Sequence, residues 1–209
     1  MIADVVVVVG VLAQLLVGAL IARGRLRFWP ATTATLGAVG IAALVVGDPA
    51  WCASVSTEAA VVAGVAGGLG FYAATRAVVG VESRRPALRE AVSGVYDHAT
   101  DVPFALALAL SLAIAVPGEE LFFRGLVLPQ LRAATTPLLG AILTWLVGAR
   151  VGLAWKSLPL FAGAVVGGAL WTALGAWSGG VLSPLICHLL WTGAMIAWPP
   201  RVARDKVTR

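Results

Sequence analysis

Near the N-terminus the sequence reads VVVVVGVLAQLLVGALIA over residues 5–22, followed at once by the basic stretch RGRLR at 23–27. A helix crosses the hydrocarbon core of a bilayer in about 17–25 predominantly apolar residues, and the first stretch meets that length without a single charge. It begins without the basic residues of a cleaved signal peptide and exceeds the usual length of the apolar part of such a peptide. We therefore expect residues 5–22 to form a retained membrane helix.

Comparable uncharged stretches recur along the rest of the chain. Of its 209 residues, 60% are hydrophobic and 12% are charged, about half the charged share of an ordinary soluble domain. A water-soluble globule of this composition would have too little polar surface to cover itself. We predict an all-α, polytopic transmembrane helical bundle that forms a single integral membrane domain over residues 1–209. The further uncharged stretches are 31–47, 59–75, 102–118, 133–149 and 157–200, of which the last turns at 175–180 and supplies two spans.

These stretches give seven membrane helices, with an eighth if residues 119–132 insert separately. Thirteen of the fifteen basic residues fall on one side of such a bundle, and only Arg124 and Arg132 fall on the other. Because lysine and arginine gather in cytoplasmic loops, we expect the N-terminus outside and the C-terminus in the cytoplasm of a multi-pass plasma-membrane protein. The thirteen residues are Arg23, Arg25, Arg27, Arg76, Arg84, Arg85, Arg89, Arg150, Lys156, Arg201, Arg204, Lys206 and Arg209.

The basic balance, a net charge of +5, is thus explained by membrane orientation and anionic lipid. We expect membrane lipid as a partner and no nucleic acid. Residues 81–101 form the one sizeable polar segment between spans, which is typical of an amphipathic helix at the membrane interface. Residues 201–209 form a basic tail. Two cysteines are too few for a disulfide framework or a multi-cysteine metal site.

Three charges stand in an apolar setting in the segment PGEELFFRG at 117–125. At membrane depth each charge costs about 2.5–3.5 kcal/mol on the insertion scale, so such residues usually have a function. Glu120 and Arg124 are four residues apart and can pair on a helix. Glu119 has no such partner, because residue 123 is phenylalanine. An unpaired buried carboxylate suits a general base that acts on water, whereas the alternative is a solvated surface loop.

Three more polar residues are candidates for the same site. His188 lies within the last apolar stretch, and Thr192 follows it by one helical turn, so both face the same side. Together they could hold a water molecule or a carbonyl oxygen. Arg150 closes the fifth span. The structural alternatives are a hydrogen-bonded core histidine, a threonine bonded to its own backbone, and an arginine that marks the membrane boundary.

In their order and spacing these residues resemble the CAAX-protease and bacteriocin-processing (Abi) family of intramembrane proteases over about residues 100–200. The first family motif is intact as EELFFR at 119–124. The second, Phe-xxx-His, aligns with LVGAR at 146–150, in which leucine and arginine replace the two motif residues. The third, His-xxx-Asn or Asp, reads HLLWT at 188–192 and keeps only the histidine.

The resemblance implies roles for the matching positions. Glu119 would activate the attacking water, and Glu120 would pair with Arg124 to position the site. His188 and Thr192 would bind or stabilise the oxyanion of the tetrahedral intermediate. Arg150, at the position of the family histidine, could assist the oxyanion but could not act as a base.

The sequence thus predicts an intramembrane endopeptidase that hydrolyses a peptide or a segment of a membrane protein. No cofactor is expected, because His188 with carboxylates alone makes a poor zinc site. One alternative is a catalytically inactive relative that binds a partner or serves as a membrane scaffold, since Arg150 and Thr192 depart from the family pattern. Another is a small proton-coupled transporter in which Glu119 and Glu120 relay protons.

Overall fold

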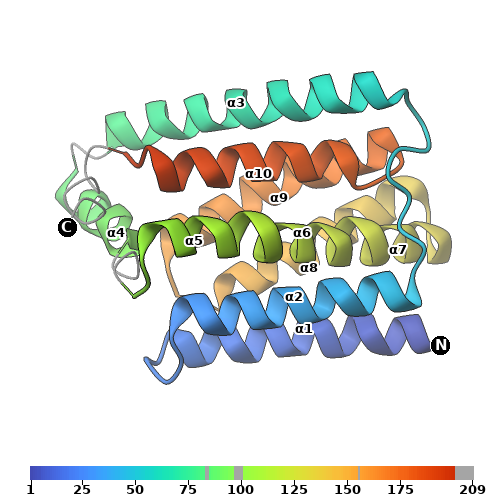
Figure 1. The fold of residues 1–209 in the computed structure, drawn as a ribbon, viewed down its shortest axis with the longest axis horizontal. Helices are drawn as coiled ribbons and strands as arrows, with labels where there is room; N and C mark the ends of the chain where they lie inside the picture. Colours follow the sequence, from blue (N-terminus) through green and yellow to red (C-terminus); the bar gives the residue numbers. More distant parts are fainter. Residues whose placement is uncertain (83–84, 97–100, 155, 201–209) are drawn as a thin grey trace.

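The structure, a computed structural model, describes residues 1–82, 85–96, 101–154 and 156–200. Its helices lie side by side in one bundle (Figure 1). The predicted basic tail at 201–209 and parts of the predicted interfacial segment, 83–84 and 97–100, lie outside the described residues. The helices are α1 (Ile2–Ile21), α2 (Phe28–Val46), α3 (Thr57–Glu82), α4 (Pro86–Val95), α5 (Phe104–Leu110), η2 (Ser111–Ala115), α6 (Val116–Glu120), η3 (Leu121–Val127), α7 (Leu128–Ala134), α8 (Pro137–Leu153), α9 (Leu158–Ser178) and α10 (Leu182–Ala197).

The predicted helical membrane bundle is confirmed. Five helices are long and apolar enough to cross a membrane, and α8 and α10 are shorter apolar helices. These correspond one to one with the seven predicted spans. No separate eighth helix forms from residues 119–132, because α5 to α7 run on as one continuous helix over Phe104–Ala134.

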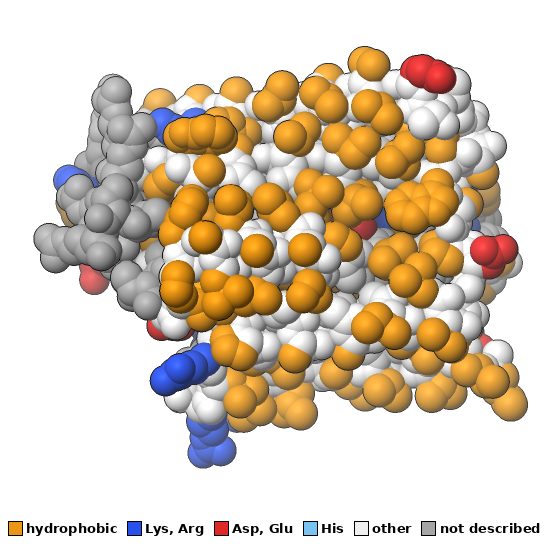
Figure 2. Space-filling model, viewed as in Figure 1, with side chains coloured by type: hydrophobic (Ala, Val, Ile, Leu, Met, Phe, Trp, Pro, Cys, Tyr) orange, Lys and Arg blue, Asp and Glu red, His pale blue; other side chains and the backbone are white. Residues whose placement is uncertain are grey.

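The lateral surface of the bundle is apolar. Figure 2 shows hydrophobic side chains spread over the face that it presents, with lysine and arginine gathered toward one end. Large aliphatic side chains such as Leu16, Val62 and Leu138 are exposed on three different helices. In water such a surface would be an aggregation liability, whereas in lipid it is the ordinary exterior of a spanning protein.

The two ends of the bundle differ in charge. The α1–α2 connection, α4 and the C-terminal end of α10 lie at one end, and the N-terminus lies at the other (Figure 1). The arginines at 23, 25 and 27 therefore share an end with Arg89 of α4, as the charge pattern predicts. Arg132, which breaks the pattern, donates a hydrogen bond to the Ala176 carbonyl oxygen at 3.3 Å. Which end faces the cytoplasm stays a prediction.

The predicted interfacial segment is divided differently in the structure. α3 continues to Glu82, so α4 is a short helix of ten residues over Pro86–Val95. Its charged side chains, Arg89 and Glu90, are exposed, while Val92 is buried. This one-sided burial is the pattern of an amphipathic helix, and its position at the membrane surface stays a prediction.

The central helix that carries the charged motif is irregular in two places. Two π-helical stretches, η2 and η3, flank α6, which ends at Glu120. Each stretch ends two residues before a proline, Pro117 or Pro129. Proline lacks the N–H group of a regular helix and crowds the preceding turn, so a widened turn before each proline has a physical reason. Such π-turns are frequent at functional sites, and here they bracket both glutamates.

A close helix crossing fixes the position of α6. A Cβ atom added to Gly118 would overlap the Leu36 carbonyl oxygen of α2. We expect Gly118→Ala to lower the free energy of unfolding by about 1–3 kcal/mol, because backbone atoms cannot yield as a side chain can. Gly70→Ala is the matched control, since a Cβ atom there would meet nothing within 4 Å. Denaturant titration in detergent, followed by tryptophan fluorescence, measures both, and equal stabilities for the two variants would contradict the crossing.

Candidate active site

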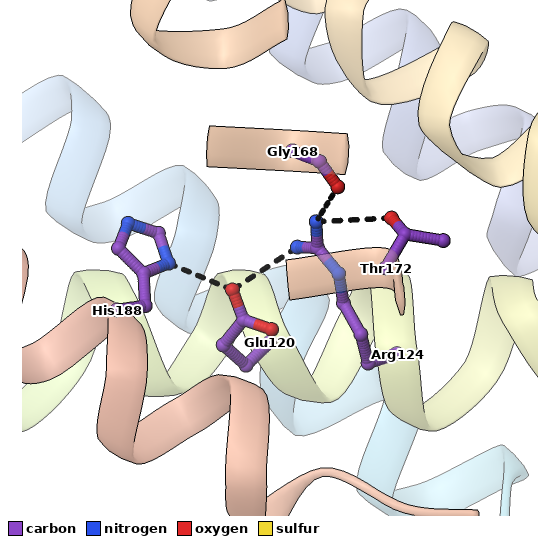
Figure 3. A network of polar contacts seen from close by, with 5 residues as sticks. All are labelled: Glu120, Arg124, Gly168, Thr172 and His188. Carbon is purple, nitrogen blue, oxygen red and sulfur yellow. Dashed lines mark hydrogen bonds and ion pairs between the residues drawn. The ribbon is translucent and has the colours of Figure 1, made fainter. Parts of the chain in front are cut away.

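Glu120 is the centre of a buried polar network (Figure 3). Its side chain is 0% exposed. One carboxylate oxygen, Oε1, lies 3.0 Å from the Arg124 Nη1 atom and 2.7 Å from the His188 Nδ1 atom. The ion pair predicted from the four-residue spacing of Glu120 and Arg124 is thereby confirmed. His188 reaches the same oxygen from α10, so the network joins the motif helix to the last helix.

Arg124 also ties the motif helix to α9. Its Nη2 group donates to the Gly168 carbonyl oxygen at 3.2 Å and to the Thr172 hydroxyl at 3.3 Å. The guanidinium lies 5.7 Å from the centre of the Trp171 ring. A buried charge pair is tolerated better when further hydrogen bonds accompany it. Arg124 has two acceptors besides Glu120, whereas its Nε atom and the second carboxylate oxygen of Glu120 have no partner among the described residues. The three helices are thus held in one arrangement around Glu120.

The imidazole of His188 is fixed on two sides. Trp171 stacks on it with ring centres 3.6 Å apart and planes 15° from parallel. Because a carboxylate accepts hydrogen bonds, Nδ1 donates to Glu120 when that acid is ionised. The other ring nitrogen, Nε2, is then left for a substrate or water. This is the arrangement of a histidine oriented by a carboxylate.

Glu119 and His188 line the same cavity. The cavity has a volume of about 720 Å³ and extends to Val92 and Tyr96 of the α4 region. Its walls are mainly aliphatic and aromatic. Among the described residues the Glu119 carboxylate has neither a hydrogen-bond nor an ion-pair partner. The unpaired acid that the spacing predicts therefore faces an internal space next to an oriented imidazole.

Two of the predicted site residues lie outside both the cavity wall and the polar network around Glu120. The Arg150 side chain is exposed on α8, and Thr192 is half-buried on α10, and neither lines the cavity. From α8 the cavity is lined by Gly148, Val151 and Gly152. Arg150 is therefore not positioned to replace the family histidine at the cavity wall. The structure brings together Glu119, Glu120, Arg124 and His188.

Several residues that contact the network were not predicted from the sequence. They are Gly168, Trp171 and Thr172, all on α9. Gly168 and Thr172 are four residues apart, so one face of α9 offers both a carbonyl oxygen uncovered by a side chain and a hydroxyl. The four-residue spacing of Gly168 and Thr172 in an otherwise apolar helix is the sequence feature that could have identified this face of α9.

The described part of the chain contains no group of three or more histidine, cysteine, aspartate or glutamate side chains that could hold a metal ion. Cys52 and Cys187 are both free, and Cys187 is buried. That the site works without a cofactor stays a prediction from the sequence.

Residues 101–194 match the family model of the type II CAAX prenyl endopeptidase Rce1-like proteins. This segment is Rce1-like. The match confirms the resemblance drawn from the motifs, and it begins and ends close to the predicted core at 100–200. The family, by its description, is one of peptidases, and Glu119, Glu120, Arg124 and His188 all lie within the Rce1-like segment. No curated protein and no solved structure matches the chain.

Proposed function

We propose that this protein is an intramembrane endopeptidase in which Glu119 activates a water molecule. One observation carries the proposal: Glu119 and His188 line one cavity, and buried Glu120 holds His188 at 2.7 Å. A general base, an oriented imidazole and a space for a substrate are thus adjacent. The Rce1-like match of this segment supports a peptidase reaction.

The proposed reaction has two stages. Glu119 takes a proton from water as the water oxygen attacks the carbonyl carbon of the scissile peptide bond. The carbonyl oxygen gains negative charge, and a doubly protonated His188 donates to it from Nε2 while Nδ1 donates to Glu120. The C–N bond then breaks, and Glu119 returns the proton to the departing nitrogen, which leaves a carboxyl terminus and an amine.

The side chains that line the cavity favour a substrate that is presented at the membrane. They are mainly apolar between Glu119 and α4, so an apolar peptide or a segment of a membrane protein fits them better than a hydrophilic loop. We further propose a plasma-membrane location with the N-terminus outside. The α4 end of the cavity would then face the cytoplasm.

An inactive, ligand-binding relative is the second candidate, and one feature of α8 favours it. The residues that α8 places on the cavity wall, Gly148, Val151 and Gly152, carry no titratable group. The second family motif would supply a histidine from this helix. A chain without that imidazole could keep the cavity and bind a partner without cleaving it.

Placing a histidine on α8 tests the enzymatic proposal. A Cβ atom at Gly148 would meet only Phe123 Cε1, at 3.9 Å, so the site has room for a side chain. We expect Gly148→His to raise the cleavage rate by about tenfold or more, since a positioned acid–base group contributes about 10²–10⁴-fold. Arg150→His is the matched control and should change little, because residue 150 is exposed.

The measurement is digestion of an apolar peptide library by the protein in lipid nanodiscs, read by mass spectrometry. Cleavage by the wild type with a gain in Gly148→His supports the proposal. No cleavage by the wild type or either variant, with intact peptide retained on the protein, would favour the binding role instead. A gain in Arg150→His alone would contradict the assignment of the cavity wall on α8.

A further inference from the structure

The cavity has an unbalanced charge. Glu119 is the one acid among the residues that line it, and no lysine or arginine among the described residues lines it. Arg124, which lies nearby, is committed to Glu120, Gly168 and Thr172. The carboxylate of Glu119 therefore has no permanently charged cation beside it on the mainly apolar wall, where the imidazole of His188 is the one basic group among the described residues.

Such a charge is expensive without a counterion. A carboxylate removed from water is disfavoured unless hydrogen bonds or an opposite charge compensate it. Glu120 next to it has this compensation from Arg124 at 3.0 Å, whereas Glu119 has no partner among the described residues. A positively charged group of a ligand would supply the opposite charge that is missing at this position.

Four of the side chains that share the cavity wall with Glu119 are aromatic. Trp171, Trp191, Phe71 and Phe123 all line the cavity. Phe71 stacks on Trp191 with ring centres 5.1 Å apart, and Trp171 meets Trp191 edge-on at 5.7 Å. The Trp191 indole nitrogen donates to the Thr75 hydroxyl at 3.1 Å, which fixes the orientation of its ring. Aromatic rings attract cations, and most strongly where water is excluded.

We propose that this cavity binds a lipophilic cation, with an ammonium group at Glu119 among the aromatic rings and an apolar body along the walls toward α4. A carboxylate with several aromatic rings is the chemistry that recognises alkylammonium groups. The apolar remainder of a volume of about 720 Å³ suits an alkyl or aryl body. This binding requires no water attack and no cleavage, so it goes beyond the proposed function.

Three ligands that share one decyl chain test the inference on the wild-type protein. They end in a trimethylammonium group, in its uncharged tert-butyl isostere and in a carboxylate. Binding to the full chain in an uncharged maltoside detergent, which carries no ammonium group, is followed by quenching of tryptophan fluorescence and by calorimetry. We expect the ammonium ligand to bind about tenfold or more tightly than the isostere, the equivalent of about 1.4 kcal/mol, and the carboxylate to bind least tightly.

Variants of the protein test which side chains cause the preference for the ammonium ligand. Glu119→Gln should bring the ammonium and isostere affinities to within about twofold, because the charge is lost and the shape is kept. Glu58→Gln is the matched control, since Glu58 is exposed at the start of α3, and it should keep the wild-type preference. Trp171→Leu should weaken the ammonium ligand more than the isostere.

Equal affinity of the wild type for the ammonium and the isostere would overturn the inference, and so would a preference that survives in Glu119→Gln. The comparison of ligands on the wild type needs no variant to fold. The result is also independent of the proposed function. If the protein prefers the ammonium ligand and cleaves no peptide, the cation site is supported and the endopeptidase activity is contradicted. If the protein cleaves peptides and shows no cation preference, the endopeptidase activity is supported and the cation site is contradicted.

Discussion

Arg124→Met is expected to lower the free energy of unfolding by about 3–5 kcal/mol, because it leaves Glu120 buried without its countercharge. The Glu120 side chain is 0% exposed, and Arg124 is its only cationic partner of permanent charge among the described residues. The variant also leaves the Gly168 carbonyl oxygen and the Thr172 hydroxyl without their donor. Titration from mild detergent into a denaturing detergent, followed by tryptophan fluorescence, measures the loss.

A double variant separates the charge from the packing. Glu120→Gln with Arg124→Met removes both charges, so we expect it to be less destabilised than the sum of the single variants by about 1–3 kcal/mol. Arg132→Met is the control for the loss of an arginine on the same helix, since Arg132 makes one hydrogen bond at a half-buried position. Additive effects of the two single changes would show that the pair at 3.0 Å is not coupled.

Glu119→Gln is expected to reduce kcat/KM for peptide cleavage by about 10²–10⁴-fold, the usual contribution of a general base. The loss should fall on kcat, because glutamine keeps the shape of the side chain and loses its ability to take a proton. The fold should be unchanged, since the carboxylate has no partner among the described residues to lose. Steady-state kinetics on one cleaved peptide give the two constants.

Glu58→Gln provides the comparison for this activity loss. It makes the same chemical change at an exposed position at the start of α3, away from the cavity, and should keep the wild-type kcat/KM. A Glu119→Gln protein that cleaves as fast as Glu58→Gln would remove Glu119 from the mechanism. A loss confined to KM would make Glu119 a binding residue instead.

Much of the bundle was predictable because lipid sets a simple rule. Each uncharged stretch of sufficient length becomes a helix, since backbone groups in hydrocarbon must be satisfied within the segment. The same regularity predicted the Glu120–Arg124 pair, because residues four apart on a helix are neighbours. Both inferences use only local spacing along one helix.

Contacts between helices were harder to predict. α9 is apolar around its whole circumference, so periodicity does not show which face meets the motif helix. From the sequence alone, Trp171 and Thr172 could therefore face either the lipid or the side chains of His188 and Arg124. The rotation that the structure selects places Trp171 at 3.6 Å from the imidazole.

The position of Arg150 shows that aligning a motif by residue number alone does not determine which face of a helix a residue occupies. Successive residues of a helix turn by about 100°, so Gly148 and Arg150 differ by about 200° and lie on nearly opposite faces. A two-residue shift in alignment therefore exchanges a cavity wall for an exposed surface. The structure places Gly148 on the wall and exposes Arg150.

We propose above all that the cavity lined by Glu119 and His188 is where peptide bonds are hydrolysed. The most direct test is the parallel digestion of one apolar peptide library by the wild type and by Glu119→Gln in lipid nanodiscs, with every new terminus identified by mass spectrometry. We expect the wild type to cleave at defined bonds and the same termini to be absent with Glu119→Gln. Identical product sets from the two proteins, or an intact library after incubation with the wild type, would contradict it.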